Sequence, residues 1–196
     1  MKLKVSFYQQ ASVDRIAKNL LGKVLISRIN NRLTSGIIVE TEAYSYKEKG
    51  SHAYNNLRTA RTETMFGEGG VAYVYLCYGI HNLFNIVTNK RDKAEAVLIR
   101  ALEPIDGINE MMRRSLGKTD HRITSGPGKL TKALGIDRTV NGKLLTGSDV
   151  WVEDRGIVIA RNNIVVTKRI GIDYAGEDAL LPWRFYLKDN PWISRP

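Results

Sequence analysis

Two glutamates and a tyrosine at the end of an apolar run are the first residues whose types and spacing could support catalysis. Glu40, Glu42 and Tyr44 follow three branched apolar residues in the segment "IIVETEAYSY" (37–46). Alternate residues of a strand share one face, so the two carboxylates would lie roughly 6.5–7 Å apart. This separation suits a water molecule held between an acid and a base in glycosidic chemistry. Glutamates at a strand edge are also common without any function, and spacing alone does not choose between these two.

A predicted β-hairpin supplies a second group of candidates. In "VAYVYLCYGIHNLFNIVTN" (71–89), side chains alternate on both sides of the turn "YGIH", as is typical of two antiparallel strands. Tyr73 and Tyr75 share a face, where tyrosines more often belong to a core than to a binding site. Tyr78 differs, because it stands at the hairpin tip, where there is little core to join. An exposed aromatic side chain on a basic protein could wedge between stacked bases, although a turn tyrosine packed on a neighbouring loop is the simpler alternative.

A glycine-rich segment, "SGPGKLT" (125–131), has part of the pattern of a phosphate-binding loop. The P-loop requires a glycine five positions before the Gly128–Lys129 pair, and this chain has Ile123 there, which excludes nucleotide hydrolysis of that kind. A glycine loop at a helix start still presents free N–H donors. We therefore predict that Gly126, Gly128 and Lys129 contact a backbone phosphate.

Other catalytic arrangements lack support in the sequence. The three histidines and the single cysteine lie far apart, at His52, His81, His121 and Cys77. Their spacing does not match that of zinc ligands. A serine hydrolase is also not expected, because the chain has no Gly-x-Ser-x-Gly motif.

Composition limits the class of protein. A chain of 196 residues with 43% hydrophobic residues can form one sizeable core, so a single domain over residues 1–196 is expected. Thirty Lys and Arg against twenty Asp and Glu give a formal charge of +10, spread along the chain. Spread basic charge suggests an anionic partner, nucleic acid first, although a merely basic protein explains the charge equally well. The absence of a long apolar stretch, of a signal-peptide core and of a second cysteine favours the cytoplasm and no membrane partner.

The predicted elements indicate an α+β class with a largely antiparallel sheet. Ser12 caps a helix whose apolar face ends before Gly22. Strands at 23–27 and 35–44 are joined by a turn at Asn30-Asn31. A polar, glycine-dotted loop then covers 45–70, with a short helical turn near "RTETMF", and so long a loop is usually functional or disordered.

Further elements follow the hairpin. Residues 96–104 form a strand, and Pro104 opens a helix that Gly117 ends. The segment 124–136 is a loop that enters a short helix. Later strands are expected in "DVWVED" (149–154), "GIVIARNNIVVTK" (156–168) and "WRFYLK" (183–188).

The chain contains a series of motifs that resembles the alkyladenine (3-methylpurine) DNA glycosylases, in their compact bacterial form. The motifs run in order over nearly the whole chain: "VETEAY" (39–44), His52, "YVYLCYGIHNLFN" (73–85), "LIRALEP" (98–104), "SGPGKL" (125–130) and "RFYLKDNPWIS" (184–194). The resemblance implies a curved antiparallel sheet with flanking helices and a protruding β-hairpin. It also implies an enzyme that acts on double-stranded DNA containing a damaged purine, as a monomer associated with the nucleoid and without a cofactor or metal.

The resemblance also assigns roles to residues. Glu42 matches the carboxylate that activates water, and Arg100 matches an arginine near the base and the water. Tyr44, His52 and Tyr75 match the residues that enclose a flipped base, and Asn85 matches a residue at the purine edge. Tyr78 matches the aromatic side chain that fills the gap in the duplex.

The implied reaction is base excision. The enzyme would flip an alkylated or deaminated purine out of the duplex, hydrolyse its N-glycosidic bond with a glutamate-activated water, and leave an abasic site. Two alternatives remain: a non-enzymatic nucleic-acid binder, for example of structured RNA, and a glycosylase that also cleaves the strand. The second requires an amine nucleophile, and the matched motifs supply no lysine for it.

Overall fold

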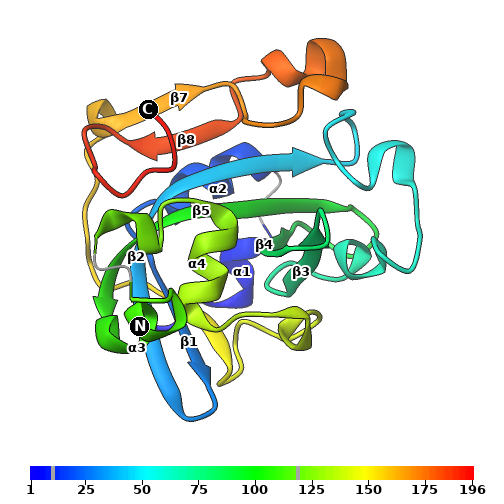
Figure 1. Cartoon of the computed structure of the whole chain (residues 1–196). Coiled ribbons are helices and arrows are strands. Elements are labelled where there is room, and N and C mark those ends of the chain that lie inside the picture. Colours follow the sequence, from blue (N-terminus) through cyan, green and yellow to red (C-terminus); the bar gives the residue numbers. More distant parts are fainter. Residues whose placement is uncertain (10–11, 118–119) are drawn as a thin grey trace.

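The computed structural model describes residues 1–9, 12–117 and 120–196, and its centre is one antiparallel sheet. The eight strands found there have the order β3-β4-β5-β2-β1-β6, and β8 pairs with β2 and β7 off this path. Their bounds are β1 Val24–Ile29, β2 Arg32–Ser45, β3 Ala72–Cys77, β4 His81–Thr88, β5 Glu95–Asp106, β6 Val150–Glu153, β7 Ile164–Thr167 and β8 Arg184–Leu187. Figure 1 shows helices beside this sheet. The predicted α+β class is confirmed.

Short helices flank the sheet. The α-helices are α1 Val5–Tyr8, α2 Val13–Leu20, α3 Ile108–Arg114 and α4 Pro127–Leu134. Short 3₁₀ segments are η1 Tyr54–Asn56, η2 Glu63–Phe66, η3 His121–Ile123, η4 Arg138–Val140 and η5 Arg161–Asn163, and the longer η6 Asp173–Leu180 is kinked at Gly176. Within the described ranges, no helix has the length and apolar character needed to cross a bilayer.

The long strand β2 is the scaffold of the molecule. Its first half pairs with β1, its residues 40–42 pair with β8, and β5 pairs with it on the other side. The pairing register with β5 shifts on both sides of Glu40, and such a bulge re-aims the neighbouring side chains. The two glutamates therefore lie where β2 exchanges one partner strand for another.

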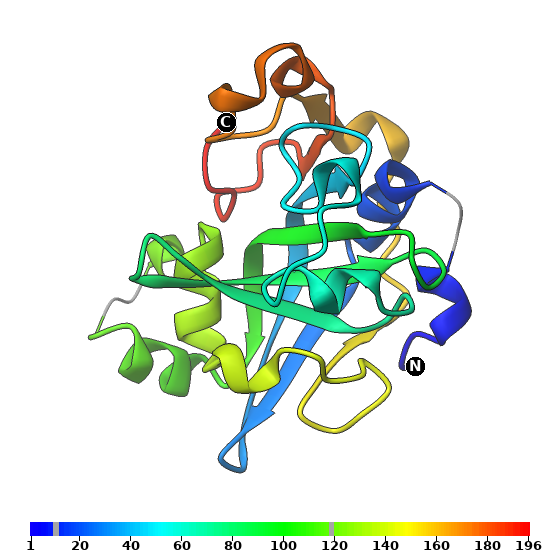
Figure 2. The same ribbon diagram turned by 90° about the vertical axis from the view of Figure 1, so that its right-hand side faces the viewer.

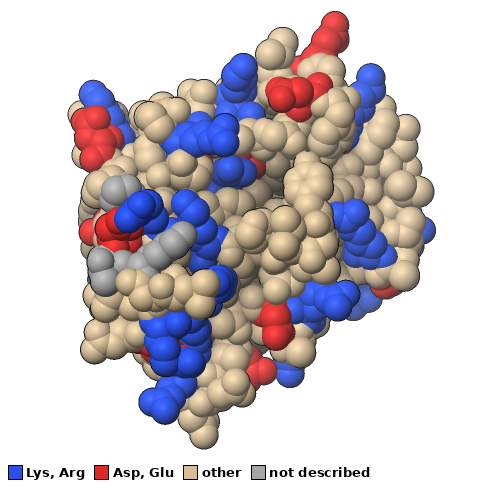
Figure 3. Space-filling model, viewed as in Figure 1, with Lys and Arg blue, Asp and Glu red and all other residues tan. Residues whose placement is uncertain are grey.

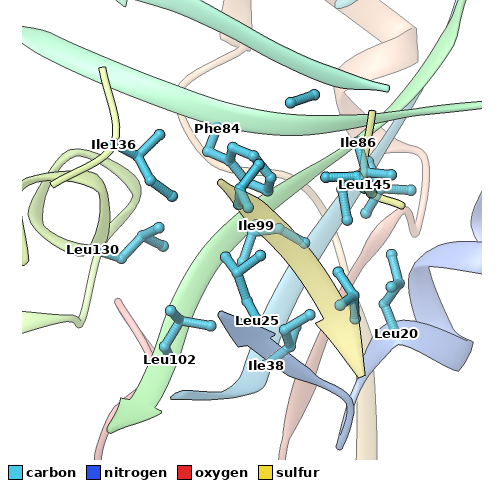
Figure 4. Packing of buried hydrophobic residues seen from close by; sticks show 14 of the residues in the cluster. Leu20, Leu25, Ile38, Phe84, Ile86, Ile99, Leu102, Leu130, Ile136 and Leu145 are labelled. Carbon is cyan, nitrogen blue, oxygen red and sulfur yellow. The ribbon is translucent and has the colours of Figure 1, made fainter. Parts of the chain in front are cut away.

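The hydrophobic core packs α2 and α4 onto the sheet. Figure 4 shows side chains from both helices and from the sheet converging on one cluster. Ile99 and Leu102 of β5 and Leu25 of β1 are all less than 2% exposed. Burying such side chains contributes about 1.5–3 kcal/mol each, and the cluster fixes the position of β2 relative to β5.

Several predicted turns and helix ends are confirmed. Asn30 and Asn31 have φ angles of +52° and +57°, the backbone that a two-residue hairpin turn requires. Ser12 occupies the N-cap position of α2, but its hydroxyl bonds to Asp14 and not to a backbone N–H. The helix ends at Leu20, and Gly22 has φ +81°. The 45–70 loop contains η1 and η2, the second at the predicted helical turn.

The predicted helix exists as α3, but its predicted start at Pro104 is wrong. Strand β5 continues to Asp106, and Pro104 pairs with Gly36 beside a register shift. Such an irregularity tolerates a residue without an N–H donor. Gly107, at φ +73°, breaks the strand, and α3 begins only at Ile108.

The strand predicted over 156–168 is shorter than expected. Only Ile164–Thr167 pairs as β7, after a 3₁₀ turn at Arg161–Asn163. Among the described residues, no strand pairs with the apolar residues before that turn, and Val158 is 90% exposed.

Candidate active site

A cavity of about 490 Å³ brings together side chains from distant parts of the chain. The size is within the range of small-molecule sites. Six of the predicted site residues line it: Tyr44, His52, Tyr75, Tyr78, Asn85 and Arg100. They come from β2, the 45–70 loop, the β3–β4 hairpin and β5.

Glu42 is fully buried beside this cavity and holds three hydrogen bonds. Its Oε2 accepts from the Tyr44 hydroxyl at 2.7 Å and from Arg100 Nη1 at 3.2 Å. Its Oε1 accepts from the backbone N–H of Ile170 at 2.8 Å. The carboxylate is therefore fixed in orientation, and Oε1 keeps a lone pair that can accept from a water molecule.

Glu40 is equally buried but has different neighbours. Its Oε1 accepts from Arg184 Nε at 2.7 Å and from the Ser194 hydroxyl at 2.9 Å, and its Oε2 accepts from Ser194 N at 2.6 Å. Arg184 lies on β8 and Ser194 near the end of the chain. Glu40 therefore fastens the C-terminal segment to β2.

Arg100 lies between the two carboxylates. Its Nε is 3.3 Å from Glu40 Oε1 and its Nη1 is 3.2 Å from Glu42 Oε2, with the side chain only 10% exposed. Buried charges require partners, and this guanidinium supplies one to each glutamate. Its own Nε forms no hydrogen bond.

Tyr44 lines the cavity and donates its hydroxyl to Glu42. Burial, followed by the adjacent Glu42 carboxylate, raises the pKa of the Tyr44 hydroxyl well above its ordinary value. The hydroxyl thus stays protonated and donates to Glu42. Beneath the ring lies the buried guanidinium of Arg169, 4.7 Å from the ring centroid.

His52 is held as a neutral imidazole. Burial, followed by the nearby Arg61, lowers the pKa of His52 to about 4. Arg61 Nη2 lies 3.1 Å from His52 Nε2, and Tyr73 Oη lies 3.0 Å from Nδ1. An arginine can only donate, so Nε2 accepts, and the imidazole proton is on Nδ1.

Tyr75 is the centre of an aromatic group. Its ring centroid lies 4.6 Å from that of His52 at an interplanar angle of 78°, and 5.4 Å from that of Tyr73. Burial raises the pKa of the Tyr75 hydroxyl far above its ordinary value. A flat ligand that enters this cavity would meet ring surfaces of several orientations.

Asn85 connects the cavity to the hairpin backbone. Its Nδ2 donates to Tyr73 O at 3.2 Å and to Leu83 O at 3.4 Å, and the residue is 4% exposed. Both amide hydrogens are thereby used, and the side-chain oxygen is left as an acceptor.

Tyr78 stands at the tip of the β3–β4 hairpin and is 90% exposed. It has φ +49°, and Gly79, with φ +73°, continues the turn. A positive φ is unusual for a bulky residue. The neighbouring Ile80 is also 73% exposed, so the tip presents two apolar side chains to solvent.

The glycine loop lies beside the base of this tip. An added Cβ on Gly128 would approach His81 Cγ to 2.7 Å, and the Thr131 hydroxyl donates to Asn82 O at 2.7 Å. Figure 2 shows the hairpin reaching across the molecule to α4. Close contact explains why Gly128 has no side chain. Gly126, at φ +134°, precedes the helix.

Lys129 faces a second groove, of about 720 Å³, which it shares with Arg122, Lys188 and polar residues of the C-terminal segment. In Figure 3, Lys and Arg form a column over the α3 and α4 side of this face, beside a central hollow. The spread of basic residues in the sequence becomes a basic surface once the chain folds.

Sequence patterns do not single out several residues of the cavity. Arg61, Ile170 and Tyr174 line it, and Arg169 supports Tyr44 from below. For Arg169, Ile170 and Tyr174, the only feature of the sequence that could draw attention to them is a basic pair and a glycine that interrupt an apolar run in "KRIGIDY" (168–174). Ile170 and Arg169 contact β2, whereas Arg61 contacts His52 and Tyr75, and Tyr174 contacts Gly50; sequence spacing does not predict any of these contacts.

Known proteins match this chain over nearly its whole length. The model of a family described as "Methylpurine-DNA glycosylase (MPG)" matches residues 6–191. A protein of Alkaliphilus oremlandii is 47% identical over 204 residues and one of Carboxydothermus hydrogenoformans is 47% identical over 195, each with 100% of both chains covered. One of Natranaerobius thermophilus is 44% identical over 197 residues, with 99% of both chains covered.

All three relatives carry the name "Putative 3-methyladenine DNA glycosylase". Both kinds of match confirm the resemblance in the motifs. The chain belongs to the methylpurine-DNA glycosylase family.

Proposed function

We propose that this protein is a DNA glycosylase of base-excision repair that removes alkylated or deaminated purines from duplex DNA. The observation that carries the proposal is Glu42, a fixed carboxylate beside a cavity lined with aromatic side chains. Family membership and the names of the relatives support the same activity.

The cavity would receive a purine flipped out of the helix. Flipping costs a few kcal/mol, least for a damaged base. Tyr44, His52 and Tyr75 would enclose the base, with Asn85 at its edge. Tyr78 would fill the space left in the duplex, because it is exposed at the tip beside the cavity.

Glu42 would act as the general base. Its Oε1 would accept a proton from the attacking water, and its charge would stabilise the oxocarbenium-like sugar. Tyr44 and Arg100 would hold Oε2, so that the other oxygen meets the water. The base leaves with the bonding electrons, and an abasic site remains.

Strand cleavage is not part of the proposal. It requires an amine that attacks the sugar, and the described lining of the cavity contains no lysine.

We propose a monofunctional enzyme that acts as a monomer in the cytoplasm, needs no cofactor, and contacts phosphates through Gly126, Gly128 and Lys129. The basic column of Figure 3 fits such contacts.

The test is a base-release assay on duplexes that carry 3-methyladenine, 7-methylguanine, hypoxanthine or ethenoadenine, with a chelator present. Wild-type protein should release at least one of these bases. Glu42→Gln should bind the lesion and lose release by about 10²–10⁴-fold. Glu40→Gln is the matched control, with lowered stability but measurable release.

Absence of release by the wild-type protein, together with tight nucleic-acid binding, would favour the non-enzymatic binder. Equal losses in the two glutamate variants, at equal melting temperatures, would contradict the role of Glu42. Cleaved strands without added base or heat treatment would show a lyase.

A further inference from the structure

Arg61 places a positive charge at the mouth of the cavity, over the Tyr75 ring that the flipped base is expected to contact. Its guanidinium carbon lies 4.9 Å from the centroid of the Tyr75 ring. Its Nη2 bonds to His52 Nε2 at 3.1 Å. The side chain therefore contacts two of the three residues proposed to enclose the base.

The charge of Arg61 differs from that of the other arginines nearby, which have acidic partners. Within the described residues, no salt bridge joins Arg61 to a carboxylate, whereas Arg100 in the same cavity is paired with Glu40 and Glu42. Three positions earlier, Arg58 pairs with Glu63 and Asp92 and lies over Phe66. Arg58 and Arg61 lie on one loop but have different environments, and of these two only Arg61 lines the cavity.

A base that stacks on Tyr75 must share or take the ring surface that Arg61 covers. The two kinds of damaged purine differ in this contact, because some alkylated purines carry a positive charge and deaminated purines are neutral. A cationic base would gain from the tyrosine ring, but it would compete with Arg61 for that ring and be repelled by its charge. A neutral base meets no such repulsion and can accept hydrogen bonds from the guanidinium.

We propose that Arg61 is a specificity-determining residue that disfavours cationic bases relative to neutral ones. The inference rests on the proposed function. It adds that the site discriminates between damaged bases by their charge. Repulsion of the wrong ligand is an established route to specificity. Arg61 is exposed at the mouth of the cavity, so water and salt reduce its effect.

The experiment compares single-turnover release of 7-methylguanine, which is cationic, with that of hypoxanthine, which is neutral, from otherwise identical duplexes at neutral pH. For Arg61→Gln we expect the ratio of cationic to neutral release to rise by about threefold to tenfold. Arg61→Lys keeps the charge and should keep the ratio near that of the wild type. The melting temperature should not change in either variant, because the side chain is exposed.

Arg58→Gln is the matched control, since it removes the same charge from the same loop outside the cavity. The inference is overturned if Arg61→Gln leaves the ratio unchanged, or if Arg58→Gln raises it equally. A loss of affinity common to both duplexes cancels in the ratio, so a phosphate contact cannot mimic the expected result. Failure of the wild-type protein to release either base would instead reject the proposed function.

Discussion

At the scale of single residues, two buried glutamates on one strand have different hydrogen-bond partners. Glu40 is held by Arg184 and Ser194, and Glu42 by Tyr44, Arg100 and Ile170. Neither is exposed, and a buried carboxylate without partners would be costly. The same requirement for partners thus gives a structural role to one and leaves the other beside the cavity.

His52 should make stability depend on pH. Its pKa of about 4 in the folded protein lies below the ordinary value of 6.5, so the unfolded chain takes up this proton first as pH falls. The free energy of unfolding should therefore fall between about pH 6.5 and pH 4, and this group should have no effect above that range. Denaturant midpoints across this range should show a shallower fall for His52→Gln. Equal slopes in both proteins would contradict the shift.

Asn85 should discriminate between hypoxanthine and guanine, which differ only in the 2-amino group. By the family resemblance its side chain would lie at that edge, where an added amino group would clash. Asn85→Ser should raise release of undamaged guanine and change hypoxanthine release less. Asn85 also donates to two hairpin carbonyls. A uniform loss on both bases with a lowered melting temperature would mean that these backbone bonds are its only role.

At the scale of elements, the β3–β4 hairpin carries an apolar tip away from the core. Tyr78→Ala should weaken binding to lesion duplexes by about tenfold, and binding to single strands much less, because only a duplex has a gap to fill. Titration of both substrates measures the difference. Val158→Ala, which removes another side chain that is 90% exposed, is the control. Equal weakening on both substrates would make Tyr78 a simple surface contact.

A buried ion pair connects the 45–51 segment to the segment that contacts Glu42. Arg169 bonds to both oxygens of Glu48 at 2.8 and 2.7 Å and to the backbone oxygens of Ala43 and Asp178. The next residue, Ile170, donates to Glu42. This clamp joins the loop that leads to His52 with the support of the proposed general base.

Removing one member of the clamp should destabilise the protein strongly. Arg169→Met or Glu48→Gln should each lower the free energy of unfolding by about 3–5 kcal/mol, because the remaining charge is buried without its partner. The double variant should lose less than the sum of the two. Chemical denaturation of the four proteins measures the coupling. Additive losses would show that the two side chains do not depend on each other.

At the scale of the whole molecule, the charge of +10 should govern DNA binding through counterion release. The logarithm of the binding constant should fall with the logarithm of salt concentration, with a slope near −0.9 for each phosphate neutralised. Lys129→Gln should make the slope smaller by about 1. Lys23→Gln, which removes a lysine already paired with Asp154, should leave it unchanged. A slope that neither variant alters would exclude Lys129 from the phosphate contacts.

Local patterns in the sequence were sufficient to predict much of the architecture. Strand alternation, the Asn30-Asn31 turn and the short helix within 124–136 depend on neighbours within a few residues, and each is found in the structure. The order of the motifs was sufficient to identify the family, because blocks such as "TEAY" and "LIRALEP" can be recognised without knowledge of their contacts in the fold. Local rules failed at Pro104, where pairing with β2 prevailed over the preference of proline for a helix start.

Only the tertiary structure decided which residues share the cavity. Sequence spacing placed Glu40 and Glu42 on one strand, but several of their partners come from residues 170, 184 and 194, more than a hundred positions later. The environment of Arg61 likewise depends on how its loop folds against the hairpin. Hydrogen bonds and charge contacts act over a few ångströms, and the distance between two residues along the chain does not determine the distance between them in the fold.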